Sequence, residues 1–118
     1  MFGFEKLDVW QKSVEFADQI YRCTAFFPND EKFGLTSQLR RAAVSISSNI
    51  AEGSGRQSSN DFIRFLSIAY GSVMECVSQL HIANRLNYIN HETLQPVLQL
   101  AETIAKILSR LRTSLQEK

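Results

Sequence analysis

Apolar residues recur at steps of three and four along four stretches of the chain, the spacing that places them on one face of an α-helix. The first stretch runs from Asp8 to Phe26 and stops before Pro28, which cannot continue a helix. The pattern predicts a first helix of about five turns. We expect its core stripe to consist of Trp10, Val14, Ala17 and Tyr21.

The second helix is expected to begin between Gly34 and Thr36 and to end at Gly53, where a glycine offers a left-handed C-terminal cap. The segment Gly53-Ser54-Gly55 then predicts a flexible hinge before the next helix. The apolar positions of this second helix that predict its buried face are Leu35, Leu39, Ala42, Ile46 and Ile50.

The third helix opens with Ser58 placed three residues before Asp61, so that the hydroxyl can accept a free backbone N–H and the carboxylate can face the positive end of the helix dipole. It is expected to reach Leu86. Its predicted core face consists of Phe62, Phe65, Ala69, Val73, Cys76, Leu80 and Ala83.

This third helix carries a second apolar stripe, rotated from the first, that an isolated bundle would not need. Surplus apolar surface of this kind is commonly buried between subunits, which predicts a homo-oligomer. Wide packing inside a monomer explains the same stripe equally well. The residues of the second stripe are Ile63, Tyr70, Met74 and Val77.

Asn87 and Asn90 bracket the last turn, and Pro96 fits the first turn of a fourth helix that starts near Thr93. The apolar seam of this helix alternates steps of three and four at Leu94, Val97, Ala101, Ile104, Leu108, Leu111 and Leu115. Four helices joined by short connections predict an all-α fold, an antiparallel up-down-up-down four-helix bundle formed by a single domain over residues 1–118.

Composition agrees with a globular protein, because 44% of the 118 residues are hydrophobic and 21% are charged. The formal net charge is only +1, so any nucleic-acid contact must come from a local basic surface. The chain lacks an apolar run of about 18 residues and has an acidic residue by position 5, so we expect a cytoplasmic protein with no membrane association. Cys23 and Cys76 are expected to be buried, reduced thiols.

The residues that catalysis or metal binding would need do not occur together. His81 and His91 are the two histidines, and neither is accompanied by a nucleophile and an orienting group at helical spacing. The chain also lacks the Glu and Glu-x-x-His sets that build di-iron sites in helix bundles. We therefore expect no enzymatic activity, no metal and no cofactor.

The polar side of the second helix offers two interpretations. One is a nucleic-acid-binding surface, in which the phosphate backbone is bound by Arg40, Arg41, Arg56 and Arg64. The other, which we favour, is a polar network that fixes the bundle or a subunit interface, with Arg41, Asn49 and Glu52 hydrogen-bonding to Glu75 and Gln79. The structural motif in this second interpretation comprises Ser37, Ser45, Asn49, Glu52, Gly53, Glu75 and Gln79.

Several separated motifs, in the same order, resemble those of a known family. The stretch from Leu35 to Arg56, with Arg40-Arg41 and Asn49-Ile50-Ala51-Glu52-Gly53, closely resembles the four-helix bundle proteins encoded in intervening sequences of bacterial 23S ribosomal RNA genes. Leu7 to Lys12 resembles that family's opening motif, and Asp61 to Glu75 resembles its third helix. The resemblance spans nearly the whole chain.

The resemblance implies a four-helix subunit that assembles into a ring-like homopentamer, without known catalytic activity and with a proposed nucleic-acid association. A related branch contains accessory proteins of diversity-generating retroelements, which bind nucleic acid and associate with a reverse transcriptase. We therefore expect a bacterial, non-enzymatic homopentamer that binds RNA weakly through arginines repeated around the ring. The alternative is a protein-interaction scaffold or accessory subunit, for example to a reverse transcriptase, without nucleic-acid affinity of its own.

Overall fold

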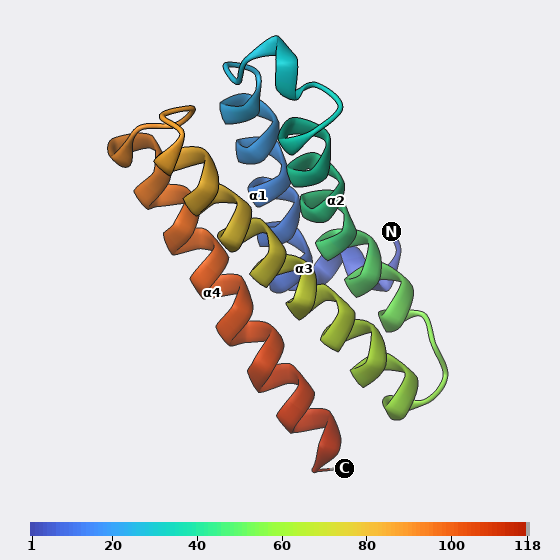
Figure 1. Cartoon of the computed structure of the whole chain (residues 1–118). Helices are drawn as coiled ribbons and strands as arrows, with labels where there is room; N and C mark the ends of the chain where they lie inside the picture. The colour runs from blue at the N-terminus through green and yellow to red at the C-terminus, as the bar shows by residue number, and fades with distance from the viewer. Residues whose placement is uncertain (118) are drawn as a thin grey trace.

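The computed structural model describes residues 1–117 and shows four α-helices packed as a bundle, with successive helices running in opposite directions (Figure 1). Helix α1 packs against α2 and α4, and α3 packs against the same two neighbours. The all-α class and the four-helix order predicted from the sequence are confirmed. The helices are α1 (Asp8–Thr24), α2 (Leu35–Ser54), α3 (Ser59–Arg85) and α4 (His91–Gln116), with short 3-10 helices η1 (Gly3–Lys6) and η2 (Asn29–Glu31).

The core runs along the bundle axis and takes side chains from all four helices. The predicted apolar faces of α2, α3 and α4 are confirmed, with their outermost members, such as Leu35, Phe62 and Leu115, half-buried against the core. Burying one Ile, Leu or Phe side chain contributes about 1.5–3 kcal/mol. Among the largest fully buried side chains are Phe16, Ile20, Leu39, Ile46, Ile50, Leu66, Leu80, Ile104 and Leu108.

The predicted core stripe of α1 is wrong, because the residues that are buried lie one position earlier in the chain than those predicted. Val14 and Tyr21 are 43% and 45% exposed, while Trp10 and Ala17 lie half-buried at the edge of the core. A neighbouring stripe with the same spacing is buried instead, because Phe16 and Ile20 place more apolar area in the core than Val14 and Ala17 would. The buried stripe of α1 is Val9, Ser13, Phe16, Ile20 and Cys23, in which the Ser13 hydroxyl donates to the Val9 carbonyl at 2.7 Å.

The predicted left-handed cap at Gly53 is also wrong. Helix α2 continues to Ser54, and among the described residues no glycine has a positive φ. Gly53 is buried, and a Cβ built on it would lie 2.6 Å from the Cβ of Phe65 on α3. A glycine is required here because the two helices approach closely, rather than because the backbone turns.

Helix starts follow the capping residues. Ser58 Oγ accepts from the Asp61 N–H at 3.1 Å, as predicted, and Asn90 Oδ1 accepts from the Thr93 N–H at 2.8 Å. Because Asn90 is the cap, α4 begins at His91 rather than near Thr93, and Pro96 falls in the second turn. Asn87, in the turn before it, has a φ of 65°, a conformation that asparagine tolerates.

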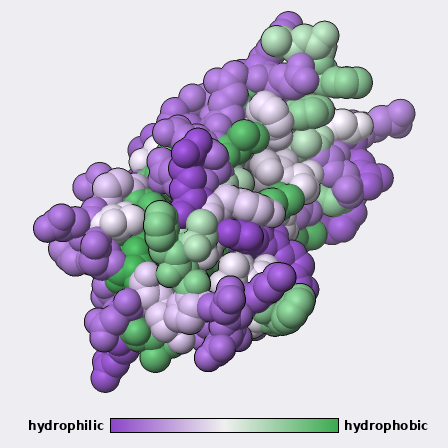
Figure 2. All heavy atoms as spheres, turned by 90° about the horizontal axis from the view of Figure 1, so that it is seen from above, coloured by the Kyte–Doolittle hydropathy of each residue, from purple (hydrophilic) through white to green (hydrophobic). Residues whose placement is uncertain are grey.

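Viewed from above, the surface is largely hydrophilic with apolar residues exposed between the polar ones (Figure 2). Phe26 and Phe33, in the connection between α1 and α2, are 86% and 89% exposed. Within residues 1–117, none of the helices combines the length and the apolar character needed to cross a membrane.

Candidate nucleic-acid interface

The four arginines proposed as phosphate contacts do not form one site. Arg40 lies near the start of α2, and Arg56 follows its end, so the two are separated by about 24 Å along the helix direction at about 1.5 Å per residue. Arg41 lies on the side of α2 that faces α3, whereas Arg40 contacts α1. The fold therefore divides these side chains among three places.

Arg40 is engaged within the subunit. Its Nε donates to Thr24 Oγ1 at 2.9 Å, and its Nη2 donates to the Tyr21 carbonyl at 3.3 Å. The guanidinium also lies 4.6 Å from the centre of the Tyr21 ring, within the range of a cation–π contact. These three contacts join α2 to α1, and they give Arg40 a structural role.

Arg56 and Arg64 converge on one aromatic ring. The two guanidinium carbons lie 4.9 Å and 4.6 Å from the centre of the Phe65 ring, which belongs to the core-facing side of α3. Arg56 pairs with Glu52 at 3.2 Å and Arg64 with Asp61 at 3.6 Å. All four of these charged side chains are at least 45% exposed. Exposed ion pairs contribute about 0–1 kcal/mol, so an incoming phosphate can displace these carboxylates.

Arg41 lines a polar hollow of about 360 Å³ between α2 and α3, together with Gln38, Ser45, Ser72 and Glu75. The Arg41 side chain is exposed, and among residues 1–117 it has no salt bridge or side-chain hydrogen bond. It is therefore available to a group from outside the subunit.

The polar network exists, but with different partners from those predicted. Ser45 Oγ lies 3.0 Å from Ser72 Oγ across α2 and α3, and Asn49 Nδ2 donates to the Ser45 carbonyl at 2.8 Å and to its hydroxyl at 2.9 Å. Gln79 Nε2 donates to Gln38 Oε1 at 3.2 Å and to Glu75 Oε2 at 3.1 Å. The network thus joins α2 to α3 at two levels.

Three predicted members of this motif lie outside the network. Glu52 pairs with Arg56 rather than with α3. Ser37 donates its hydroxyl to the Gly34 carbonyl at 3.1 Å. Gly53 contributes the close contact with Phe65 and no hydrogen-bonding side chain.

Sequence reasoning missed Phe65 as the ring that both arginines cover, and Ser72 and Gln38 as network members. Ser72 interrupts the apolar face of α3 at a core position, which is a pattern that could have identified it. Arg56 lies in the connection between α2 and α3, and no local sequence pattern indicates the path of that connection, so its position beside Phe65 was not predicted.

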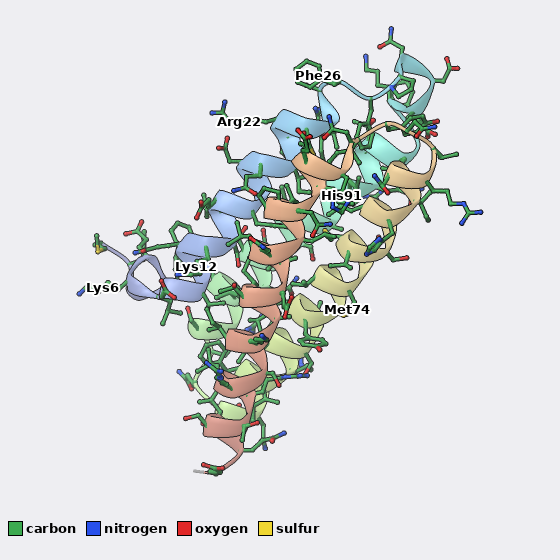
Figure 3. All side chains as sticks on the ribbon, turned by 90° about the vertical axis from the view of Figure 1, so that its left-hand side faces the viewer. Lys6, Lys12, Arg22, Phe26, Met74 and His91 are labelled. Carbon is green, nitrogen blue, oxygen red and sulfur yellow. The ribbon has the colours of Figure 1, made fainter. Side chains whose placement is uncertain are left out.

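The second stripe of α3 lies mainly against α4. Tyr70 and Val77 are half-buried against the core, and with Met74 they border a hollow of about 500 Å³ on the α4 side. Met74 is 41% exposed on the outer side of α3 (Figure 3). Ile63 is also half-buried. Much of this stripe is therefore covered inside the subunit.

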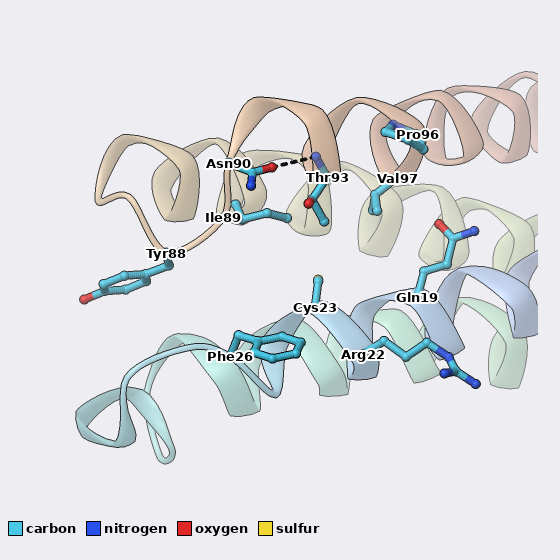
Figure 4. A pocket seen from close by; sticks show the side chains of 10 residues that line it. All are labelled: Gln19, Arg22, Cys23, Phe26, Tyr88, Ile89, Asn90, Thr93, Pro96 and Val97. Atoms are coloured by element: carbon cyan, nitrogen blue, oxygen red, sulfur yellow. Dashed lines mark hydrogen bonds between the residues drawn. The ribbon is translucent and has the colours of Figure 1, made fainter.

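An apolar groove of about 560 Å³ opens between α1 and α4 near the two connections at one end (Figure 4). Gln19 and Cys23 point from α1 toward α4, and Phe26 lies below Tyr88 (Figure 4). Burial raises the pKa of the Cys23 thiol, although the nearby Arg40 opposes this shift. The groove holds no pair of groups suited to acid–base chemistry, and in the part of the chain that the structure describes no three His, Cys, Asp or Glu residues gather as metal ligands.

Comparison with known proteins agrees with this architecture. The chain matches the model of a family described as 23S rRNA-intervening sequence protein over residues 5–110. It is also similar to the crystal structure of a protein with unknown function from the S23 ribosomal protein family of Bacteroides thetaiotaomicron, with a TM-score of 0.80 and 31% sequence identity. That match covers 88% of this chain and 97% of the other. No curated protein matches, and neither description names an enzymatic activity. The chain therefore belongs to the 23S rRNA-intervening sequence protein family.

Proposed function

We propose that this protein is a non-enzymatic homo-oligomer, a ring-like pentamer, that binds RNA weakly through arginines repeated in every subunit. The observation that carries the proposal is the convergence of Arg56 and Arg64 on the Phe65 ring, which places two exposed guanidinium groups beside each other. The match to a family named for a ribosomal RNA intervening sequence supports RNA as the ligand.

The geometry favours contact with the phosphate backbone rather than with bases. Phe65 is only 6% exposed, so its ring positions the arginines and is not free to stack on a base. Guanidinium groups bind phosphate oxygens with two parallel hydrogen bonds, and they carry no sequence information when they do so. We therefore expect RNA binding that depends on salt and is weakly selective for sequence.

Repetition supplies the affinity that one subunit lacks. Two arginines neutralise about two phosphates, which gives weak binding at physiological salt. When several copies are held in one assembly, the second and later contacts become intramolecular, and the apparent affinity rises without any new contact in a single subunit. RNA binding and self-association are therefore linked in this proposal.

The test measures binding by fluorescence anisotropy, using nuclease-treated protein, a structured ribosomal RNA fragment and a single-stranded DNA control at two salt concentrations. We expect R56A/R64A to weaken RNA binding and to flatten its salt dependence, with an unchanged oligomeric mass by light scattering. The control R85A/R110A removes the same charge from arginines exposed elsewhere and should bind almost as the parent does. Equal affinity for both double variants would mean that the Phe65 arginines are not the RNA contact.

A second candidate function is a protein-interaction scaffold, favoured by the apolar groove between α1 and α4 and by the exposure of Phe26 and Phe33 at the same end. This function requires no affinity for nucleic acid. A tagged pull-down with nuclease treatment separates it from RNA binding. A partner that survives nuclease and is lost with F26A/F33A supports the scaffold, and loss of every partner on nuclease treatment argues against it.

A further inference from the structure

Gly71 lies exposed in the middle of α3, and a Cβ built on it would meet nothing within 4 Å. Glycine in a helix interior is about 0.5–1 kcal/mol less favourable than alanine. Packing inside the subunit explains why residue 53 is a glycine, because a Cβ there would clash with Phe65. No contact inside the subunit explains the glycine at position 71. The absence of a side chain at Gly71 is therefore best explained by something that approaches from outside.

The surroundings of Gly71 have the character of a helix-docking surface, which we call the α2–α3 face and define by Arg41, Ser48, Ile68, Gly71 and Ile82. Ile68 and Ile82 are 44% and 49% exposed, and their separation of 14 residues places them on the same side of α3. Ser48 is an exposed small residue on the outer side of α2. Small residues in the middle with aliphatic side chains at the rim allow another helix to approach closely.

Two polar groups near this face have no partner within the described residues. Arg41 makes no salt bridge or side-chain hydrogen bond there, and Oε1 of Gln79 is buried without a hydrogen-bond partner. Gln79 is only 8% exposed, so its unpaired oxygen is a destabilising feature of the isolated subunit. Of the two, only Arg41 is exposed and can be paired by a group from another molecule, because the Gln79 oxygen is covered inside the subunit.

The chain itself carries a surface that complements this face. On α1, Val14 and Tyr21 are 43% and 45% exposed, and Asp18 lies between them at steps of four and three residues. Asp18 pairs with Arg22 at 3.1 Å, but both side chains are more than half exposed, so this ion pair is weak and can exchange partners. This outer stripe, the α1 face, offers apolar side chains for the rim isoleucines and a carboxylate for Arg41.

We propose that the α1 face of a second copy of this chain docks on the α2–α3 face, with Gly71 at the closest approach of the two helices and Asp18 of the second copy against Arg41. The proposal rests on the self-association in the proposed function and names the surfaces that produce it. Because the two faces are different surfaces of the subunit, the contact is head-to-tail, and such contacts generate a closed ring when the rotation permits. This contact does not use the second apolar stripe of α3, formed by Ile63, Tyr70, Met74 and Val77, that the sequence predicted as the subunit interface.

The test combines two variants, each of which damages one face only. G71Q places a side chain at the closest approach, and V14K places a charge on the α1 face, one helical turn from Asp18. Both positions are exposed, so the circular dichroism of each variant should remain that of the parent. We expect each variant alone to lose the oligomer and to sediment near the subunit mass of 13.4 kDa. T103Q, at an exposed position of α4 outside both faces, is the matched control and should keep the parent mass.

Mixing the two variants gives the decisive result. A G71Q subunit keeps its α1 face and a V14K subunit keeps its α2–α3 face, so an equimolar mixture at high concentration should form a mixed dimer through one intact contact. R41E provides a second way to break the α2–α3 face, and D18K in the same chain should restore association. A parent protein that is monomeric would overturn the proposed self-association itself. An oligomeric parent whose mass survives G71Q and R41E, or variants that give no mixed dimer, would overturn the assignment of these faces alone.

Discussion

Gly53 of α2 and Phe65 of α3 are in such close contact that a Cβ on the glycine would lie 2.6 Å from the Cβ of the phenylalanine. The same position would also lie 3.0 Å from the Phe62 ring. The backbone of α2 therefore lies directly against the Phe62 and Phe65 side chains of α3, and the contact fixes the depth at which Phe65 enters the bundle. The guanidinium groups of Arg56 and Arg64, which form the candidate RNA site, lie over the Phe65 ring. The packing of Phe65 against Gly53 therefore positions the site.

Replacing Gly53 with alanine should destabilise the fold, although alanine is the better helix former. The added methyl group forces Phe65 or the helix backbone to shift, and overpacking of this kind costs about 1–3 kcal/mol. Urea unfolding at fixed protein concentration measures the change. G55A is the control, because Gly55 has a φ of −85° and its Cβ would be 3.6 Å from the nearest atom. A G53A variant as stable as G55A would show that the helices separate easily.

The sequence was sufficient to predict the helices because their caps and periodicity are local. Ser58 acts as the predicted cap of α3, and the seam of α4 from Leu94 to Leu115 faces the core along its length, whereas the cap at Asn90 was not predicted. The prediction failed on α1, where two neighbouring stripes have the same spacing and packing against other helices decides which is buried. Val14 and Tyr21 belong to the stripe that the subunit leaves exposed.

Tyr88 joins the two connections at one end of the bundle, since its hydroxyl donates to Glu31 Oε2 at 3.0 Å. Glu31 also accepts from the N–H of Leu35 at 3.1 Å, at the start of α2. The hydrogen bond to Glu31, with a smaller effect of burial, raises the pKa of Tyr88 above its usual value of 10.0. The folded protein therefore holds the phenolic proton more tightly than the unfolded chain does.

It follows that Tyr88 contributes stability that is fully present below pH 10 and is lost as the pH rises through its folded pKa. Y88F should therefore be less stable than the parent at neutral pH and should lose less stability as the pH rises above 10. The two buried thiols also have raised pKa values, so the variant reduces this pH dependence without abolishing it. Urea unfolding across this range tests the prediction, with Y21F as the control, and equal pH profiles for the two variants would contradict it.

Arg40 should prove to be a structural arginine. R40A removes hydrogen bonds to Thr24 and to the Tyr21 carbonyl and the contact with the Tyr21 ring, so we expect a loss of about 1–2 kcal/mol in the free energy of unfolding. RNA affinity measured well below the melting temperature should stay unchanged. R22A breaks only an exposed ion pair and should cost less than about 0.5 kcal/mol. A large loss of RNA affinity in R40A would return this arginine to the binding site.

The candidate site was less predictable than the fold, because the role of each arginine depends on which helix it contacts in the folded bundle. The local sequence around an arginine does not show this. Arg40 and Arg41 are adjacent in the chain, yet one contacts α1 and the other faces the hollow beside α3. Helical geometry explains the division, since neighbouring residues point about 100° apart. The position of Arg56 depends on the path of the connection between α2 and α3, and no local sequence pattern predicts that path.

The two cysteines should differ in reactivity although both are buried. Cys76 is fully buried in α3, and burial, with a smaller effect of Glu75, raises its pKa to about 12. Cys23 is 9% exposed and borders the groove between α1 and α4, so small openings of that groove suffice to expose it. Since the thiolate is the reactive form, a thiol reagent at pH 8 should label Cys23 first and Cys76 only as fast as the bundle unfolds. The single-thiol variants C23A and C76A, labelled with and without urea, measure the two rates separately. Equal rates without urea would show that the core around Cys76 opens as readily as the groove.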